Sequence, residues 1–409
     1  MWCIFITILS GVLILEATET LSITSHGKVV ICNVAERSIN PEYSLTKHDL
    51  SLCTHLIYFE MDHYNAEKEG STKFSNDYFN TTSDGLIFKQ LPTIRKKYPN
   101  LKICLGVNSM PIDFSQMATD ERKRKQFYRN AYTYLMTSEF MGLDLSWNYA
   151  QENIYLTEYT LFVKGLGDYL RFTGALLLIR VSEQTMNMDV MYIPILSNNF
   201  DFVHFTPEYP IDDRCKAYNL SDALREHGIK RIENIVGDLL DMGVFPSKIV
   251  IGFNIGGVNF DLAFKTRNYL GYNKLCDVIS NEANGWIQFY DSEASMALAK
   301  KKHHFIDFWR NIVVFQNTHS IINRIRLALK YNIDGVMLTF INTDDVQGKC
   351  QIDDKVYNDF VSPHVNITLT MSVENSRLPL LNKINIMMTM AMYEIRKETK
   401  SEDAVIFLD

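Results

Sequence analysis

The sequence has little of what a membrane-spanning protein needs. Among its 409 residues, only residues 2–15 form a charge-free, mostly apolar run. A helix that crosses a bilayer needs about 20 such residues, and no later segment is apolar for long enough. The sequence therefore argues against a membrane span. At the N-terminus, a run of this kind is typical of a secretory signal.

Motifs for metals, nucleotides and nucleic acids are also missing. The ten histidines show no spacing typical of metal ligands, and we expect the adjacent His303 and His304 to face solvent. No glycine-rich phosphate-binding loop is present. The net charge of −7 does not favour nucleic acid or an anionic membrane, and the basic clusters at 122–125 and 300–304 are interpreted as solvated helix faces. We expect no metal, no cofactor and no nucleic-acid partner.

The apolar run at residues 2–15 predicts a secreted protein. We interpret residues 1–20 as a signal peptide and expect the rest to be extracellular. In an oxidising compartment the remaining cysteines can form disulfides, although their spacing does not assign the pairs. Three N-glycosylation sequons fit a secreted surface. The remaining cysteines are Cys32, Cys53, Cys104, Cys215, Cys276 and Cys350, and the sequons begin at Asn80, Asn219 and Asn366.

Short runs rich in apolar and β-branched residues recur along the chain. Most are apolar throughout, which is typical of strands buried on both faces of a parallel sheet. Segments with helical spacing lie between several of them, at 156–172, 221–242 (with Ser221 as a possible N-cap) and 320–331. The pattern favours a closed (β/α) barrel, with an open doubly wound sheet as the alternative. The predicted strands cover 28–33, 53–59, 101–107, 140–147, 175–181, 200–205, 248–253 and 335–340.

The strand–helix alternation breaks in one region. Residues 256–311 mix aromatic, glycine and charged residues, which indicates an insertion after the seventh predicted strand. Residues 378–390 are amphipathic and would form the last helix of the barrel. We predict a barrel over residues 21–395 and a flexible tail at 396–409.

The fourth predicted strand carries the candidate site. Residues 140–149 read Phe-Met-Gly-Leu-Asp-Leu-Ser-Trp-Asn-Tyr. Because strand side chains alternate, Asp144, Ser146 and Asn148 would share one face. Three polar side chains on one face of an otherwise apolar strand need hydrogen-bond partners or a water-filled pocket. This face is therefore the candidate binding site.

This stretch resembles the motif strand of glycoside hydrolase family 18, the chitinases, which reads Phe-Asp-Gly-x-Asp-x-Asp-Trp-Glu-Tyr-Pro. Gly142, Asp144, Trp147 and Tyr149 match that pattern. The first Asp of the motif falls on Met141, the third on Ser146 and the catalytic Glu on Asn148. The resemblance runs from about residue 28 to residue 386 and includes most of the other predicted strands.

The resemblance carries further expectations for the fold and the disulfides. It implies a (β/α)8 TIM barrel with a small α/β domain at 258–311, inserted between strand seven and helix seven. It also implies disulfides that join Cys32 to Cys53 and Cys276 to Cys350. Cys104 and Cys215 have no partner in this pattern, and we expect Cys104 to be a buried free thiol.

The departures from the motif concern its chemistry. In the family, the Glu protonates the leaving oxygen and the last Asp holds the substrate acetamido group, which attacks the sugar carbon. Asn148 has no proton to donate, and Ser146 has no charge. The tryptophan that floors the sugar pocket is replaced by Thr339, and an aromatic surface is what stacks on a sugar ring. Asp144 would be a hydrogen-bonded residue that remains from the carboxylates of the family motif. It would lie too far along the strand to act as the acid.

The resemblance therefore implies a secreted chitinase-like protein without catalysis, which would act as a lectin, a growth-factor-like signal or a secreted effector. Its partners would be chitin or N-acetylglucosamine oligosaccharides, or a cell-surface or extracellular protein. A protein-binding scaffold without sugar affinity and a divergent glycoside hydrolase are the alternatives. The candidate ligand-binding residues are Asp144, Trp147, Asn148 and Tyr149, although core packing is the favoured interpretation for Trp147 and is equally favoured for Tyr149.

Overall fold

The computed structural model describes most of the chain. The described residues are 27–35, 44–59, 86–109, 118–147, 156–181, 197–206, 228–261, 266–279, 285–302 and 309–344, together with positions 381, 384, 385 and 388. Several predictions fall outside them: the signal peptide, the three sequons, His303, His304, the tail at 396–409, and Asn148, Tyr149, Cys215 and Cys350.

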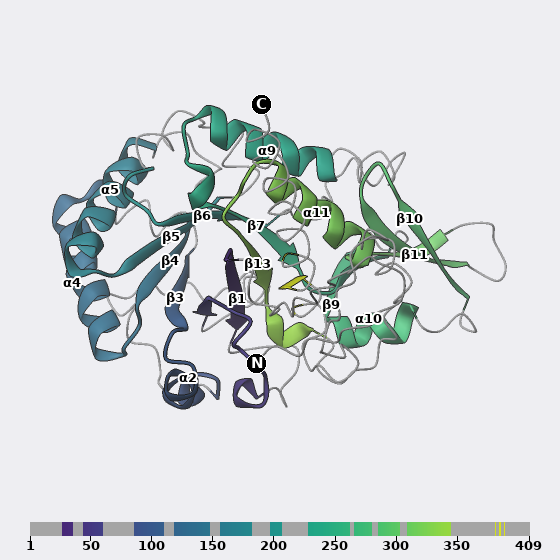
Figure 1. Ribbon diagram of the computed structural model, residues 1–409, viewed down its shortest axis with the longest axis horizontal. Helices are drawn as coiled ribbons and strands as arrows, with labels where there is room; N and C mark the ends of the chain where they lie inside the picture. Colours follow the sequence, from purple (N-terminus) through teal and green to yellow (C-terminus); the bar gives the residue numbers. More distant parts are fainter. Residues whose placement is uncertain are drawn as a thin grey trace, which may run out of the picture.

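A closed barrel of eight strands forms the centre of the molecule (Figure 1). Each strand pairs in parallel with both neighbours, around the ring and back to β1. The closed (β/α) barrel was therefore the correct choice over the open sheet. The strands are β1 Val29–Ala35, β2 His55–Phe59, β3 Lys102–Ser109, β4 Gly142–Trp147, β5 Leu176–Arg180, β6 Phe202–Phe205, β7 Ile249–Asn254 and β13 Gly335–Thr339.

Two separate apolar layers explain why the strands are apolar on both faces. Alternate residues point outward into the larger core shared with the helices, as Leu143 and Leu145 do on β4. The others point inward and form a small core on the barrel axis, which contains Ile31, Ala35, Ile57, Phe59, Cys104, Leu178, Val250 and Met337. This alternation decides which polar residues enter the barrel.

Helices cover the outside of the barrel, with α4 and α5 along one side in Figure 1. Asp120 caps α4 by accepting hydrogen bonds from the backbone of Arg122 and Lys123. Asn317 and Ser320 form a reciprocal capping box at the start of α11. The helices are α2 Leu91–Lys97, α4 Glu121–Thr137, α5 Leu156–Thr173, α9 Ile229–Asp241 and α11 Thr318–Lys330, with short 3-10 turns η1 Leu45–Lys47, η2 Phe88–Gln90, η4 Pro246–Lys248 and η6 Ile341–Thr343.

The predicted helix at 221–242 is interrupted at Gly228, and residues 221–227 lie outside the described part of the chain. Helix α9 begins at Ile229, and its N-cap is Gly228, which has an extended backbone. A Cβ at Gly228 would lie 2.3 Å from the carbonyl oxygen of Ala294, and Ile229 N donates to that same oxygen at 3.1 Å. A tertiary contact with a distant segment therefore sets this helix boundary, and Ser221 is not its N-cap.

The closing segment at 378–390 is described at four positions. Leu381, Ile384, Asn385 and Met388 are helical and buried. Their spacing places them on one face of a helix, and three of them join the outer core. At these positions the predicted helix, with one face buried, is confirmed.

A second sheet lies between β7 and α11 along the chain, at the side of the molecule opposite α4 and α5 (Figure 1). Its five antiparallel strands follow the order β10-β11-β12-β8-β9. This sheet starts near the predicted insertion at 258–311 but continues to Phe315; that the segment is a separate domain stays a prediction. The elements are β8 Gly257–Asp261, β9 Thr266–Leu270, α10 Tyr272–Ile279, β10 Trp286–Asp291, β11 Met296–Lys302 and β12 Trp309–Phe315.

One predicted disulfide is present in full. Cys32 on β1 is bonded to Cys53, just before β2, so this pairing is confirmed. Cys276 on α10 is also disulfide-bonded, but its predicted partner Cys350 lies outside the described residues. Within the described part of the chain, no helix is long and apolar enough to cross a membrane.

A buried histidine lies at the N-terminal end of the barrel. His55 is 3 % exposed, and its Nδ1 lies 2.9 Å from Thr54 Oγ1. The Thr54 hydroxyl already donates to Val30 O, so Nδ1 carries the hydrogen of a neutral ring. Burial, together with the charge of Lys102, lowers the pKa of His55 to about 4.

This pKa predicts a loss of stability in acid. The unfolded chain takes up a proton on His55 near pH 6.5, whereas the folded chain does so only near pH 4. The free energy of unfolding should therefore fall by on the order of 3 kcal/mol more in wild type than in His55→Gln as the pH drops from 6.5 to 4. Denaturant titrations over this pH range measure the difference. The same pH dependence in wild type and His55→Gln would refute the prediction.

Candidate functional site

Strand β4 carries two polar side chains into the barrel. Asp144 is fully buried and Ser146 is 5 % exposed, while Leu143 and Leu145 between and beside them join the outer core. The prediction that Asp144 and Ser146 share one face is thus confirmed. Asn148 and Tyr149 lie outside the described residues, and so does the side chain of Trp147.

Asp144 contacts a histidine that the sequence analysis did not single out. His204 on β6 places its Nε2 at 2.7 Å from Asp144 Oδ1, and the two side chains are 1 % and 0 % exposed. Strand β5 separates β4 from β6, so the contact is made across the inside of the barrel. The expectation of a hydrogen-bonded Asp144 is confirmed, with His204 as the partner.

The pair is not fully satisfied by its surroundings. Asp144 Oδ2 and His204 Nδ1 are buried and have no hydrogen-bond partner in the structure. Buried polar atoms are normally hydrogen-bonded to protein, water or ligand. Inside the barrel, these two atoms of Asp144 and His204 are therefore still able to form hydrogen bonds.

Arg180 completes a row of polar residues at this end of the barrel. The parallel register aligns Ser146 with Arg180 and Arg180 with His204. Leu178, two residues earlier on β5, belongs to the inner core, so Arg180 is on the inward face of its strand. It is half-buried. The row thus contains a hydroxyl, a guanidinium and an imidazole on three adjacent strands.

Two threonines meet near the ends of β6 and β13. Thr206 Oγ1 and Thr339 Oγ1 are 3.3 Å apart, although β7 runs between their strands. Gly252 on β7 leaves the space for this contact, because a Cβ there would lie 2.2 Å from Thr206 Oγ1. Thr339, which stands where the resemblance places a tryptophan, thus presents a small polar group and no flat aromatic surface.

Aromatic rings fill the other side of the same end. The Phe59 ring covers Gly106, where an added Cβ would be only 2.3 Å from the ring. Phe340 has a left-handed backbone, with φ 59° and ψ 67°, which is uncommon for a bulky residue. Its ring meets Phe59 edge to face, with ring centroids 6.4 Å apart. A large residue on β2 therefore takes the volume that the glycine on β3 leaves open.

Cys104 belongs to the small core inside the barrel. Cys104 is a buried free thiol, as expected, and burial followed by the charge of Asp144 raises its pKa. A buried thiol of this kind is inert. Among the described residues, no group of three or more His, Cys, Asp or Glu could hold a metal ion.

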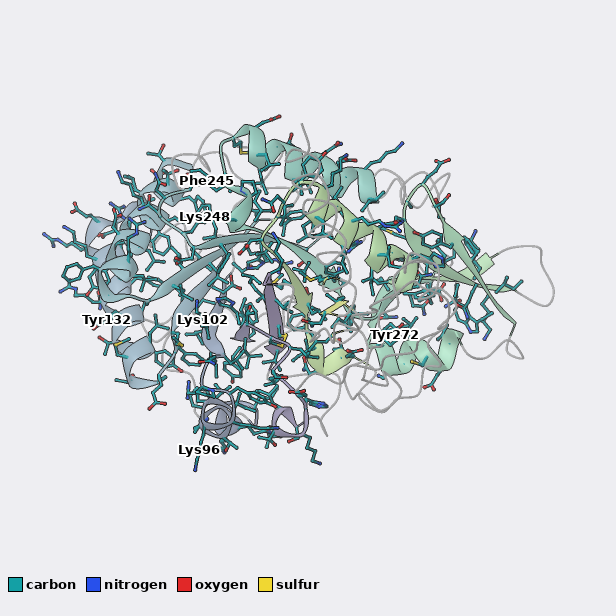
Figure 2. The ribbon with its side chains drawn as sticks, viewed as in Figure 1. Lys96, Lys102, Tyr132, Phe245, Lys248 and Tyr272 are labelled. Carbon is teal, nitrogen blue, oxygen red and sulfur yellow. A yellow bond between two sulfur atoms is a disulfide. The ribbon has the colours of Figure 1, made fainter. Side chains whose placement is uncertain are left out.

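A cavity of about 190 Å³ lies at the opposite, N-terminal end of β5 and is lined by Arg171, Asp201 and Lys248, among others. Lys248, labelled in Figure 2, donates to the carbonyls of Ser197 at 2.7 Å and Phe200 at 2.8 Å. Arg171 donates to the carbonyl of Asn198. The Lys248 and Arg171 side chains that line the cavity thus form hydrogen bonds within the protein, which indicates a structural role for them.

The chain belongs to glycosyl hydrolases family 18, whose model matches residues 30–344. A Drosophila melanogaster protein named probable chitinase 2 is 25 % identical over 404 residues, which cover 90 % of this chain and 82 % of the relative. The Ostrinia furnacalis Group IV chitinase structure superposes with a TM-score of 0.64 at 22 % identity and covers 88 % of this chain and 99 % of its own. Human YKL-39, described as a pseudo-chitinase with retained chitooligosaccharide binding, gives a TM-score of 0.60 at 17 % identity, over 88 % of this chain and 99 % of its own.

Most of the described positions that the resemblance aligns with the family motif lie on β4, Gly142–Trp147. Met141 precedes β4 at its N-terminal end and is 49 % exposed, so it is remote from the barrel mouth. Asp144 is paired with His204, and Ser146 lies one step further toward the mouth. Within the described part of the motif, Asp144 is the one carboxylate.

The fit between Phe59 and Gly106 can be tested by substitution. Gly106→Ala should lower the free energy of unfolding by about 1–3 kcal/mol, because the new methyl group overlaps the Phe59 ring. In a Phe59→Leu background the same change should cost much less, because the smaller side chain leaves room for the methyl group.

A glycine in open space provides the control for this measurement. Gly237→Ala on α9 has no atom within 4 Å of the new Cβ and should raise the free energy of unfolding by about 1 kcal/mol. Urea unfolding of the four variants measures all of these values. An unchanged stability for Gly106→Ala, or the same cost in both backgrounds, would show that the ring does not occupy this space.

Proposed function

We propose that this family 18 protein is a chitinase-like protein that does not hydrolyse glycosidic bonds and acts as a carbohydrate-binding lectin, a growth-factor-like signal or a secreted effector. The observation that carries the proposal is the burial of Asp144 and its contact with His204. This carboxylate of the motif is fully buried and bound to His204, and its neighbour is Ser146. The position of the proton donor is Asn148 in the sequence.

The chemistry of these residues supports the loss of catalysis. Protonation of the leaving oxygen requires a group with a proton to give, and general acid catalysis contributes roughly 10²–10⁴ in rate. An amide at Asn148 cannot supply it. The substrate-assisted mechanism also needs a charged group to stabilise the reacting acetamide, and Ser146 is uncharged. Both roles are therefore unfilled on the motif strand.

Binding is a separate matter from hydrolysis. Human YKL-39 is described as a pseudo-chitinase that retains chitooligosaccharide binding, so a family 18 barrel can lose one activity and keep the other. For this chain we propose oligosaccharides that contain N-acetylglucosamine as ligands, bound at the mouth above Ser146 and His204. Asn148, Trp147 and Tyr149 would line that mouth.

A protein-binding scaffold without sugar affinity is the second candidate. The contact between Thr206 and Thr339 favours it, because the pocket floor there has hydroxyls where a stacking aromatic would be expected. The Phe59 and Phe340 rings are packed against each other at this end of the barrel. The partner would then be an extracellular or cell-surface protein.

We also propose that the protein is secreted after removal of residues 1–20 and is glycosylated at one or more of Asn80, Asn219 and Asn366. Expression of the full chain in insect cells tests this point. Recovery from the medium, an N-terminus near residue 21 and a mass decrease on glycosidase treatment are expected. Retention of the chain in the cells with residues 1–20 attached would contradict the proposal.

Calorimetry with chitohexaose tests the main proposal. We expect saturable heat, and we expect no shorter oligosaccharides when the same samples are analysed by mass spectrometry after long incubation. An active family 18 chitinase serves as the positive control, and turnover by this chain should be at least about 10⁴-fold slower. Turnover near that of the control would favour a divergent hydrolase. A lack of heat with no turnover would favour the protein-binding scaffold.

A further inference from the structure

Helices α4 and α5 carry an apolar surface on the outside of the barrel, at the side where Figure 1 shows both helices and Figure 2 labels Tyr132. We propose that this surface binds an acidic, amphipathic helix of a partner protein. The inference goes beyond the proposed function, because the sugar site at the barrel mouth takes no part in it. The α4–α5 surface consists of Lys125, Arg129, Tyr132 and Met136 from α4 and Leu161, Gly165, Tyr169 and Phe172 from α5.

Large apolar side chains of this surface are open to solvent. Phe172 is 93 % exposed, and Leu161 and Met136 are each 49 % exposed. Tyr132 and Tyr169 are half-buried. Single exposed apolar residues are common on proteins, but apolar residues gathered in one patch mark a site of interaction. The question is therefore whether these side chains form one patch.

The spacing of the residues along each helix places them in two stripes. The four α4 residues follow one another at intervals of four, three and four residues, and the α5 residues at intervals of four, four and three. Residues three and four apart are neighbours on the surface of a helix. Each set is thus one stripe along the outer face of its helix.

Aromatic contacts bring the two stripes together. The rings of Tyr132 and Tyr169 meet edge to face, with centroids 6.1 Å apart. One turn earlier, the Tyr128 ring lies 5.7 Å from that of Phe162. Both contacts advance in the same direction along the two helices, so the helices are parallel. The last member of each stripe therefore lies at the same end of the surface, and the two stripes form one patch.

A buried contact fixes the distance between the helices. Tyr128 is 7 % exposed, and its hydroxyl donates to the carbonyl of Phe162 at 3.0 Å. A Cβ at Gly165 would lie 2.6 Å from this hydroxyl oxygen, so only glycine lets α5 approach so closely. The patch is thus held in shape before a partner arrives, which lowers the entropic cost of binding.

The charges around the patch indicate the kind of partner. Helix α4 has five basic residues and one acidic residue, although the whole chain has a net charge of −7. Two acidic residues border the patch, and each is in an ion pair, Glu121 with Lys125 at 2.6 Å and Asp168 with Arg171 at 3.7 Å. Arg129 adds a further positive charge, so the border is basic. Complementary charge on a partner is acidic.

A protein helix satisfies both requirements. The stripes span 11 residues of helix, roughly 16 Å, and an amphipathic helix carries apolar side chains at the same spacing. Its acidic face would lie against the basic border. An acidic sugar chain has no apolar side chains to cover Phe172 and Leu161. A second copy of this chain would bring two basic helices together, which like-charge repulsion disfavours.

Fluorescence anisotropy with three labelled peptides of about 18 residues, or five turns, tests the proposal. The first is helical, with Leu on one face and Glu on the other. The second has Lys in place of Glu, and the third has the composition of the first in a scrambled order without an apolar face. Wild type should bind the first peptide saturably and at least tenfold more tightly than the others. Added salt should weaken this binding, because it screens charge.

Substitutions locate the binding on this surface. Phe172→Ser and Arg129→Glu should each weaken the acidic peptide at least fivefold, and Arg129→Glu should also strengthen the basic peptide. Phe245→Ser removes another exposed apolar ring, which is 58 % exposed and labelled in Figure 2. Lys230→Glu on α9 makes the same change in net charge as Arg129→Glu. Both controls should bind as wild type does, and thermal unfolding verifies that each variant is folded.

Several results would overturn the inference. One is the absence of binding by the acidic helical peptide, and another is equal binding of all three peptides. An equal loss in Phe245→Ser and Phe172→Ser would place the binding elsewhere. If phosphatidylserine vesicles bind wild type but not Phe172→Ser, while the peptides do not bind, the surface contacts lipid. A dimer in sedimentation velocity that Phe172→Ser dissociates would make the surface an interface between copies.

Discussion

A carboxylate buried inside a barrel must be neutralised or paired, and this constraint organises the candidate site. Asp144 has no exposed surface, and an unpaired charge in such a place costs several kcal/mol. His204 supplies the partner from two strands away. The contact ties β4 to β6 across the inside of the barrel. It also holds the Asp144 carboxylate away from solvent.

Other residues of the barrel strands also fit one another closely. Ser146 is an uncharged residue on the same face of β4 as Asp144, and the small residues Gly106 and Gly252 make room for Phe59 and Thr206. The barrel keeps its eight parallel strands throughout. A fold does not specify an activity, because function depends on the groups placed on it. Here the scaffold of a hydrolase family is present, and the proposed loss of catalysis concerns the side chains that it carries.

The sequence predicted the barrel because apolar runs and the alternation of side chains along a strand are local properties of the chain. Apolar runs indicated the strands, and alternation placed Asp144 and Ser146 on one face. The pairing with His204 could not be predicted in this way, because it depends on the register of three strands and on closure of the barrel. The predicted start of α9 at Ser221 was wrong for the same reason, since contacts with Ala294, far along the chain, set the start of this helix. The match of Phe59 with Gly106 is likewise visible only in three dimensions.

The free energy of coupling between Asp144 and His204 tests the central claim most directly. A double-mutant cycle with Asp144→Ala, His204→Ala and the double variant isolates this term. If the pair is a buried, mutually dependent unit, each single change should cost about 3–5 kcal/mol. The double change should then cost at least about 2 kcal/mol less than their sum. Additive costs would mean that the two side chains do not depend on each other, and the account of the site would be wrong.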